Sequence, residues 1–415
     1  MFFRRIGFDS PQLNVNDGGL QMKKKVNFSL ILAVAFSAVC VLGFAKNYEF
    51  CVRILGRATV LSASTVLPVG FDIGSDKPIE TEPPAEDKSE NNANNNTDES
   101  TSPENKTTET TEMTAGTNPQ NNTDSDFTAT PDDIRKLTEK YIQKADKDKK
   151  DGSISEQTYK NSGVTDSYGN VRIKSINDTK VSIKKLLSEK ADLSIKDKSK
   201  PAVLIFHTHT TERYQIIDRN FYAAGYTSRS EDPSQNMVRV GDAICEQLER
   251  AGYSVIHDTN IYDKKYNGAY NRSRVQIEKY LKEYPSIQVV LDIHRDAIEL
   301  NNGTKIKPVA KIKGKKCAQV MIISGCQEKG NGISGFDDWR YNLTFAVQLQ
   351  NKMETLFPGL TRPLYFCPRK YNMDTAHCSL LIEMGSDANT LDEAVYAGKC
   401  LGVSLAELMK DYTSK

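Results

Sequence analysis

The stretch AVLIFHTHTTE, residues 202–212, joins a short apolar run to a dense group of polar side chains. Apolar runs of this length, bounded by polar residues, are typical of buried β-strands. We therefore expect a strand over 202–206 that leads directly into the polar group. Similar apolar runs recur at 253–256 (YSVI), 287–293 (IQVVLDI), 318–324 (AQVMIIS) and 379–383 (SLLIE).

Helical patterns lie between these runs. Gly252 ends the first of them, and Thr390 introduces the last. Strands that alternate with helices of this length predict βαβ units, and therefore an α/β fold: a three-layer, mainly parallel sheet with helices on both faces. The predicted helices cover residues 237–252, 270–284, 340–357 and 391–410.

Three polar motifs begin where predicted strands end. His207-Thr208-His209-Thr210-Thr211-Glu212 follows the first strand, His294-Arg295-Asp296 follows the 287–293 run, and Glu383-Met384-Gly385 ends the last. In an open α/β sheet, ligand sites form at the carboxyl ends of the strands. We therefore expect these motifs to meet in one crevice, although they are far apart in the sequence.

The residue types in these motifs suit a catalytic zinc site. Such a site takes three protein ligands, commonly imidazole and carboxylate, and keeps one position for water. His209 and Glu212, spaced H-x-x-E, supply two ligands, and His294 supplies the third. Zinc lowers the pKa of its bound water to about 7, and a general base is then needed. Glu383 is the predicted base. His207 is the alternative to His209 as a ligand, or a donor to the transition state.

Each of these residues also has a simpler interpretation. Histidines at strand ends are often hydrogen-bonded loop residues, but three of the chain's five histidines lie at two strand ends, which favours a site. His257 also ends a strand and lacks a carboxylate at ligand spacing, so we expect it to be structural. Asp292 either orients His294, whose strand face it shares, or is simply a strand-end acid. His377 is expected at the surface or facing substrate.

The N-terminal part predicts a membrane anchor. Residues 26–45 contain no charge, and twenty residues span the roughly 30 Å hydrocarbon core as one helix. Lys23, Lys24 and Lys25 precede this run, which favours a cytoplasmic N-terminus (1–25) and an extracytoplasmic body. A cleaved signal peptide is the competing interpretation. The balanced net charge of +1 argues against nucleic acid as a partner.

The rest of the chain divides by composition. Residues 46–73 form a membrane-proximal segment, and 74–126 form a linker of Asn, Thr, Glu, Ser and Pro that is predicted to be disordered. An extended lead-in (127–200) precedes the predicted catalytic domain (201–415). The eight cysteines are scattered without a CxxC pair, so we interpret them as free core thiols.

Four longer stretches resemble the stage II sporulation protein P family. They are LIFHTHTTERY, GDAICEQLERAGYSVIHD, YPSIQVVLDIHRDA and LLIEMGSDANTLDEA, and the likeness extends from about Pro201 to the C-terminus. The resemblance implies a zinc-dependent peptidoglycan hydrolase of engulfment during sporulation, an N-acetylmuramoyl-L-alanine amidase that also acts as a cross-link endopeptidase. It further implies a single-pass protein of the septal or engulfing membrane that works with stage II sporulation proteins D and M.

The same resemblance assigns roles to residues. It implies metal binding by His207, His209 and Glu212, a second histidine motif at His294, and a catalytic glutamate at Glu383. Arg213 stands where the family usually has serine, and the NMDTAHCS stretch (372–379) carries His377 and Cys378 where small residues are expected. Two other functions remain open: a zinc carboxypeptidase, and a peptidoglycan-binding module whose hydrolase site has decayed.

Overall fold

The computed structural model describes residues 124–145, 148–327 and 333–414. The predicted cytoplasmic N-terminus, membrane anchor and membrane-proximal segment lie outside these residues, as does the predicted linker up to residue 123. No helix within the described ranges is long and apolar enough to span a bilayer.

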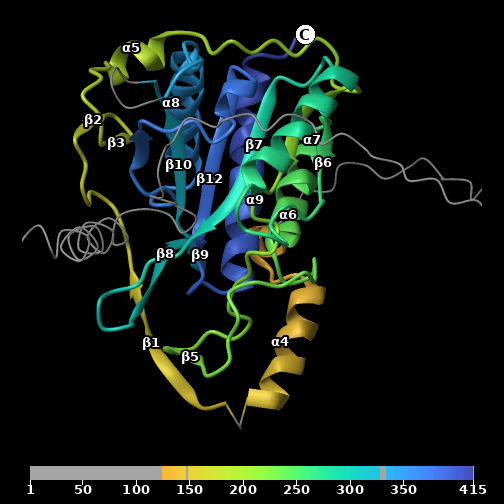
Figure 1. Cartoon of the computed structure of the whole chain (residues 1–415), viewed down its shortest axis with the longest axis vertical. Coiled ribbons are helices and arrows are strands. Elements are labelled where there is room, and N and C mark those ends of the chain that lie inside the picture. Colours follow the sequence, from red (N-terminus) through yellow and green to blue (C-terminus); the bar gives the residue numbers. More distant parts are fainter. Residues whose placement is uncertain (1–123, 146–147, 328–332, 415) are drawn as a thin grey trace, which may run out of the picture. The chain divides into compact units, whose positions relative to one another are not determined.

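A mixed, mainly parallel sheet of eight strands forms the centre of the fold, in the order β2-β3-β11-β10-β12-β7-β4-β6 (Figure 1). The pairs β2–β3 and β10–β12 are antiparallel, and the other neighbouring pairs are parallel. Every strand predicted from an apolar run lies in this sheet, so the predicted mainly parallel α/β fold is confirmed. The strands are β2 (Asp166–Tyr168), β3 (Val171–Ser175), β4 (Pro201–Phe206), β6 (Ser254–His257), β7 (Val289–Asp296), β10 (Val320–Gly325), β11 (Leu364–Cys367) and β12 (Cys378–Ser386).

Alternate residues of the central strands bury opposite faces of the sheet. Val203 and Ile293 belong to the main core, which also contains apolar residues from five helices. Leu204 and Phe206 pack on the other face against Ile277 of α7. This alternation follows from the two-residue period of a strand. The helices of the main core are α4 (Asp132–Ala145), α5 (Ile183–Ser188), α6 (Met237–Arg250), α8 (Trp339–Leu356) and α9 (Leu391–Lys410), and α7 spans Ala269–Glu283.

A second, four-stranded sheet has the order β5-β1-β8-β9. Its strand β1 comes from the segment predicted as an extended lead-in, and it pairs in parallel with β8, far along the chain. The lysine-rich stretch 305–316 forms a hairpin, which turns at Lys313 and Gly314 with φ of 47° and 84°. The strands are β1 (Lys150–Gln157), β5 (Phe221–Ala223), β8 (Lys305–Ile312) and β9 (Lys315–Ala318); α3 (Asp124–Thr128) and the 3-10 helix η1 (Met373–Thr375) complete the fold.

Strand β12 brings distant parts of the chain together. It lies between β10 and β7 in the middle of the large sheet (Figure 1), and its Glu383 is the direct neighbour of His294 on β7. Because these two strands are parallel, both residues lie near the carboxyl end of the sheet. The six cysteines in the described part of the chain form no disulfide there and are all buried, which confirms the predicted core thiols among these residues.

Candidate metal centre

The polar loop after β4 is fixed by its threonines. Thr208 donates from its backbone nitrogen and from Oγ1 to the carboxylate of Asp292, at 2.8 and 2.7 Å. Thr211 makes the same pair of hydrogen bonds to Asp263, at 3.2 and 2.7 Å. The loop is therefore held at two points. His209 lies between these threonines in the chain, and Glu212 follows them.

His209 is buried among aromatic rings. Its ring stacks on Tyr266 with 4.7 Å between centroids and meets the His294 ring edge-on at 5.3 Å. Neither ring nitrogen has a hydrogen-bond partner among the residues described, although Nδ1 lies 3.9 Å from Asp263 Oδ2. Burial, assisted by the neighbouring His294, lowers the pKa of His209 to about 2. The neutral imidazole therefore keeps a lone pair for a ligand at neutral pH.

His294 lies between two carboxylates. Its Nε2 is 2.7 Å from Asp292 Oδ1, and its Nδ1 is 3.7 Å from Glu212 Oε2. Burial opposes the charged ring, but these neighbours outweigh it, Asp292 most strongly, and raise the pKa of His294 to about 9. Without a cation nearby, His294 therefore carries a proton, which a metal ion would displace.

The two glutamates are both buried. Glu212 Oε2 accepts a hydrogen bond from the backbone of Arg295 at 3.1 Å, whereas Glu212 Oε1 and Glu383 Oε2 have no such partner within the described chain. Burial raises the pKa of Glu212 and raises that of Glu383 well above its usual value. The charge on Asp296 raises the pKa of Glu383 further.

These unpaired atoms fit a metal ion. A buried polar atom without a partner costs about 1–3 kcal/mol, so a cluster of them is expected only where something else binds. His209, Glu212 and His294 supply two imidazoles and one carboxylate, a donor set that suits zinc. Glu383 lies beside them on the neighbouring strand.

His207 lies apart from this group. Its side chain is on the α6 side of the sheet, where Nε2 is 2.9 Å from Nε2 of His257 and Nδ1 is 2.9 Å from the carbonyl oxygen of Ile293. The sequence left His207 and His209 as alternative ligands, but their side chains lie on opposite sides of the sheet, because β4 ends at Phe206 and the alternation of the strand ends with it. The structure thus brings His209, Glu212, His294 and Glu383 together, without His207.

Sequence analysis missed several neighbours of the site. Asp263 and Tyr266 come from the loop between β6 and α7, and Tyr270 opens α7 with its ring edge-on to His209 at 5.7 Å. Arg229 lies 3.8 Å from Glu212 and forms an ion pair with Asp263. The available signal was positional: β6 ends at the same edge of the sheet, so the loop that follows it is also expected to contribute.

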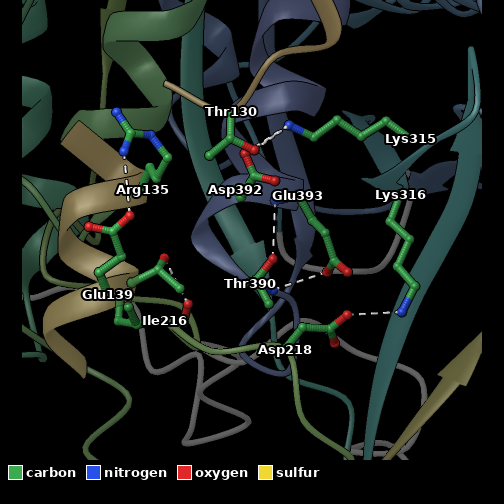
Figure 2. Close-up of a pocket in the computed structure, with 11 residues that line it drawn as sticks. Thr130, Arg135, Glu139, Ile216, Asp218, Lys315, Lys316, Thr390, Asp392 and Glu393 are labelled. Carbon is green, nitrogen blue, oxygen red and sulfur yellow. Dashed lines mark hydrogen bonds and ion pairs between the residues drawn. The ribbon is translucent and has the colours of Figure 1, made fainter. Parts of the chain in front are cut away.

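A second acidic cluster lies elsewhere in the described residues. Glu156, Asp218 and Glu393 have carboxylate oxygens within 4.8 Å of one another. Lys307 contacts all three, at 3.0, 2.6 and 3.0 Å, so an ammonium group already occupies the position between these carboxylates. Figure 2 shows the adjoining pocket of about 440 Å³, in which Lys316 also points toward Asp218. We therefore assign no metal to it.

The fold and site together define a class: α/β proteins with a buried group of imidazoles and carboxylates at the carboxyl edge of the sheet. A family profile described as Stage II sporulation protein P (SpoIIP) matches residues 62–406. The chain therefore belongs to the stage II sporulation protein P family. Stage II sporulation protein P of Bacillus subtilis (strain 168) is 28% identical over 224 residues. That match covers 51% of this chain and 52% of the relative, so it spans about half the relative's length.

Two solved structures are similar over about half the chain. The N-acetylmuramoyl-L-alanine amidase AmiC2 of Nostoc punctiforme is 11% identical, with a TM-score of 0.30. The matched region makes up 52% of this chain and 98% of that one. The CwlD amidase from Clostridioides difficile, solved with the GerS lipoprotein, is also 11% identical, with a TM-score of 0.32, and 51% of this chain covers 99% of it. Similarity at this level assigns no function to this chain.

Proposed function

We propose that this chain is a zinc-dependent peptidoglycan hydrolase that acts in engulfment during sporulation. Its reaction is that of an N-acetylmuramoyl-L-alanine amidase, with a second activity on stem-peptide cross-links. One observation carries the proposal: His209, Glu212, His294 and Glu383 form a buried group in which ligand atoms lack partners among the described residues. Membership of a sporulation family supports the cellular role.

His209, Glu212 and His294 would hold the zinc ion. When bound, zinc polarises a scissile carbonyl and lowers the pKa of a bound water to about 7. Asp292 lies against Nε2 of His294, and Asp263 faces Nδ1 of His209. A carboxylate that accepts from the remote ring nitrogen fixes the orientation of a metal-binding histidine. His294 thus has an orienting carboxylate at 2.7 Å, whereas Asp263 faces His209 from 3.9 Å, beyond hydrogen-bond distance.

Glu383 would transfer the proton. Its carboxyl is buried beside His294, and its raised pKa makes the side chain able to hold a proton between two steps of a reaction. In the proposed reaction Glu383 accepts the proton of the attacking water and returns it to the amine that leaves. Exclusion of bulk water by Tyr266 and Tyr270, which cover His209, strengthens these charge interactions.

We further propose a location for this activity. The uncharged run 26–45 would anchor the chain in the cytoplasmic membrane as a single span, with the catalytic domain outside. A flexible polar linker over 74–126 gives a reach of roughly 40 Å from the membrane. In this position the enzyme would meet peptidoglycan, in a complex with stage II sporulation proteins D and M.

The purified full-length chain, incubated with peptidoglycan with and without a chelator, tests the activity. We expect mass spectrometry to detect whole stem peptides and denuded glycan, which disappear on chelation and return with zinc. Release of single terminal residues would indicate a carboxypeptidase instead. Intact peptidoglycan after incubation with folded, zinc-loaded protein would contradict the hydrolase and favour a binding module.

A further inference from the structure

His207 and His257 form a buried pair on the face of the sheet opposite the candidate metal centre. His207 is fully buried, and its two ring nitrogens contact the Ile293 carbonyl oxygen and His257 Nε2, both at 2.9 Å. His257 Nδ1 in turn lies 3.0 Å from Oδ1 of Asp242 on α6. The contacts therefore run in a line from the surface of α6 to the backbone of β7.

The chemistry of these contacts fixes the direction of the two outer hydrogen bonds. A carbonyl oxygen only accepts, so Nδ1 of His207 carries the hydrogen and donates to Ile293. Nδ1 of His257 faces the carboxylate of Asp242, which also only accepts, so this nitrogen carries a hydrogen as well. The two Nε2 atoms lie 2.9 Å apart, and they share the one hydrogen between them.

This line of contacts ends at an acceptor with no proton to pass on. His207 therefore cannot serve the reacting groups as an acid or a base through Ile293. Its hydrogen bond can instead hold the carbonyl group of Ile293 in place, and Ile293 directly precedes His294 in the chain. Helix α6 packs closely against this pair. A Cβ atom added to Gly241 would lie only 2.4 Å from His257 Nε2 and 2.8 Å from His207 Nε2.

We propose that His207 is a positioning residue that holds the β7 backbone at Ile293 and thereby sets the imidazole of His294 in the metal centre. His257, fixed by Asp242, keeps the His207 ring turned toward β7. This proposal rests on the proposed function, since it assumes that His294 is a zinc ligand. It gives His207 a role other than metal binding. It also accounts for the position of His207 on the other side of the sheet from His209, two residues further along the chain.

Two substitutions at one position separate this role from that of a ligand. In His207→Asn the amide nitrogen takes the place of Nδ1 and still donates to Ile293, whereas His207→Gln places its amide near the Nε2 position and loses that bond. We expect zinc affinity, measured by competition with a chromogenic chelator, to stay within about threefold of wild type in His207→Asn. It should fall about 10–100-fold in His207→Gln, as for other residues that orient metal ligands.

The visible absorption spectrum of the cobalt-substituted protein supplies a second readout, because it reports the coordination of the metal directly. We expect a wild-type spectrum for His207→Asn and an altered one for His207→Gln. Equal, large losses of zinc affinity in both variants would overturn the proposal and make His207 a ligand. Wild-type affinity and spectra in both, with only a lower melting temperature, would also overturn it. A wild-type protein that binds no zinc would instead refute the proposed function, and the positioning role with it.

Discussion

At the scale of single residues, the candidate metal centre is organised before any ion binds. Asp292, which contacts His294, is itself held by both hydrogen bonds of Thr208. Asp263, which faces His209, is held by Thr211 in the same way. A carboxylate that is itself held by two hydrogen bonds therefore lies near each imidazole. Little orientational freedom of these side chains remains to be lost when a metal binds.

The first prediction concerns Glu383. Glu383→Gln keeps the shape of the side chain but removes its ability to accept a proton, so we expect turnover to fall by about 10²–10⁴-fold. Zinc content, measured by elemental mass spectrometry, should remain that of the wild type, because Glu383 is not a proposed ligand. Glu407→Gln, on the exposed side of α9, is the control and should change neither quantity. Full activity in Glu383→Gln would rule out the proposed base.

The second prediction concerns the partner of His294. Asp292→Asn is isosteric but no longer presents a charged acceptor to Nε2, so we expect zinc affinity to fall about 10–100-fold. Asp258→Asn is the matched control: Asp258 is also a buried acid that follows a strand, but its hydrogen bonds go to Asn260 and Tyr262. Competition titrations that give equal affinities for the two variants would show that Asp292 does not orient His294.

At the scale of elements, Lys307 ties separate parts of the fold together. It lies on β8 with 1% of its side chain exposed, and it contacts Glu156 on β1, Asp218 in the loop after β4, and Glu393 in the first turn of α9. Glu393 also closes the capping box of α9 with Thr390. One buried ammonium group thus joins the small sheet to the helix that follows β12.

The third prediction follows from this contact. Lys307→Met leaves Glu393 buried without its cation, and breaking a buried ion pair in this way typically costs about 3–5 kcal/mol. Urea denaturation should show a loss of this size. Lys316→Met is the control, since Lys316 contacts the same two exposed acids but is itself 41% exposed, and such surface pairs contribute only about 0–1 kcal/mol. Equal midpoints for the two variants would contradict the prediction.

The same cluster predicts a pH dependence. Burial opposes the charged carboxylates, but hydrogen bonds from Lys316 and Lys307 outweigh it and lower the pKa of Glu156 and of Asp218. A lowered pKa in the folded state means that the stabilisation is complete above the ordinary carboxyl pKa of about 4 and is lost as the pH falls through the folded value. The urea midpoint should therefore fall on acidification below about pH 4, less steeply in Lys307→Met. An identical slope in both proteins would contradict this.

The elements that could be predicted from the sequence are those whose buried residues form a run of apolar side chains. The apolar runs that became β4, β7 and β12 are buried along most of their length, so hydrophobicity alone located them. Strand β1 reads KDGSISEQ and buries only Ile154, so its residues carried no such signal. It becomes a strand because the backbones of β5 and β8 offer hydrogen bonds, which only the folded chain provides.

The candidate site was likewise predictable only in part. His209, Glu212, His294 and Glu383 were placed at strand ends, and the parallel sheet brings those ends together. The direction of a side chain beyond a strand end was not predictable, because the two-residue alternation stops where the strand does. His207 shows this, since it follows β4 directly yet contacts His257. Asp263 was missed because it lies in a loop without periodic pattern.

At the scale of the whole molecule, metal binding should stabilise the fold. A ligand that binds only the folded state at 100 times its Kd adds about 2.7 kcal/mol to the free energy of unfolding. Differential scanning calorimetry should therefore give a lower melting temperature in excess chelator, restored by zinc and not by calcium, which prefers oxygen ligands. His209→Ala should show no zinc-dependent shift. The same melting temperature with chelator and with zinc would contradict a metal centre in the wild type.

The central place of β12 bears on how the protein is made. A ribosome delivers β4 and β7 well before β12, yet β12 belongs between β10 and β7, and Glu383 comes with it. A chain still being synthesised therefore has the histidines of the candidate site before it has the proposed proton acceptor, and its sheet is still open at the middle. If the chain cuts the wall by the proposed reaction, a translation product that ends before β12 lacks the proposed base, and we expect such a product to be inactive.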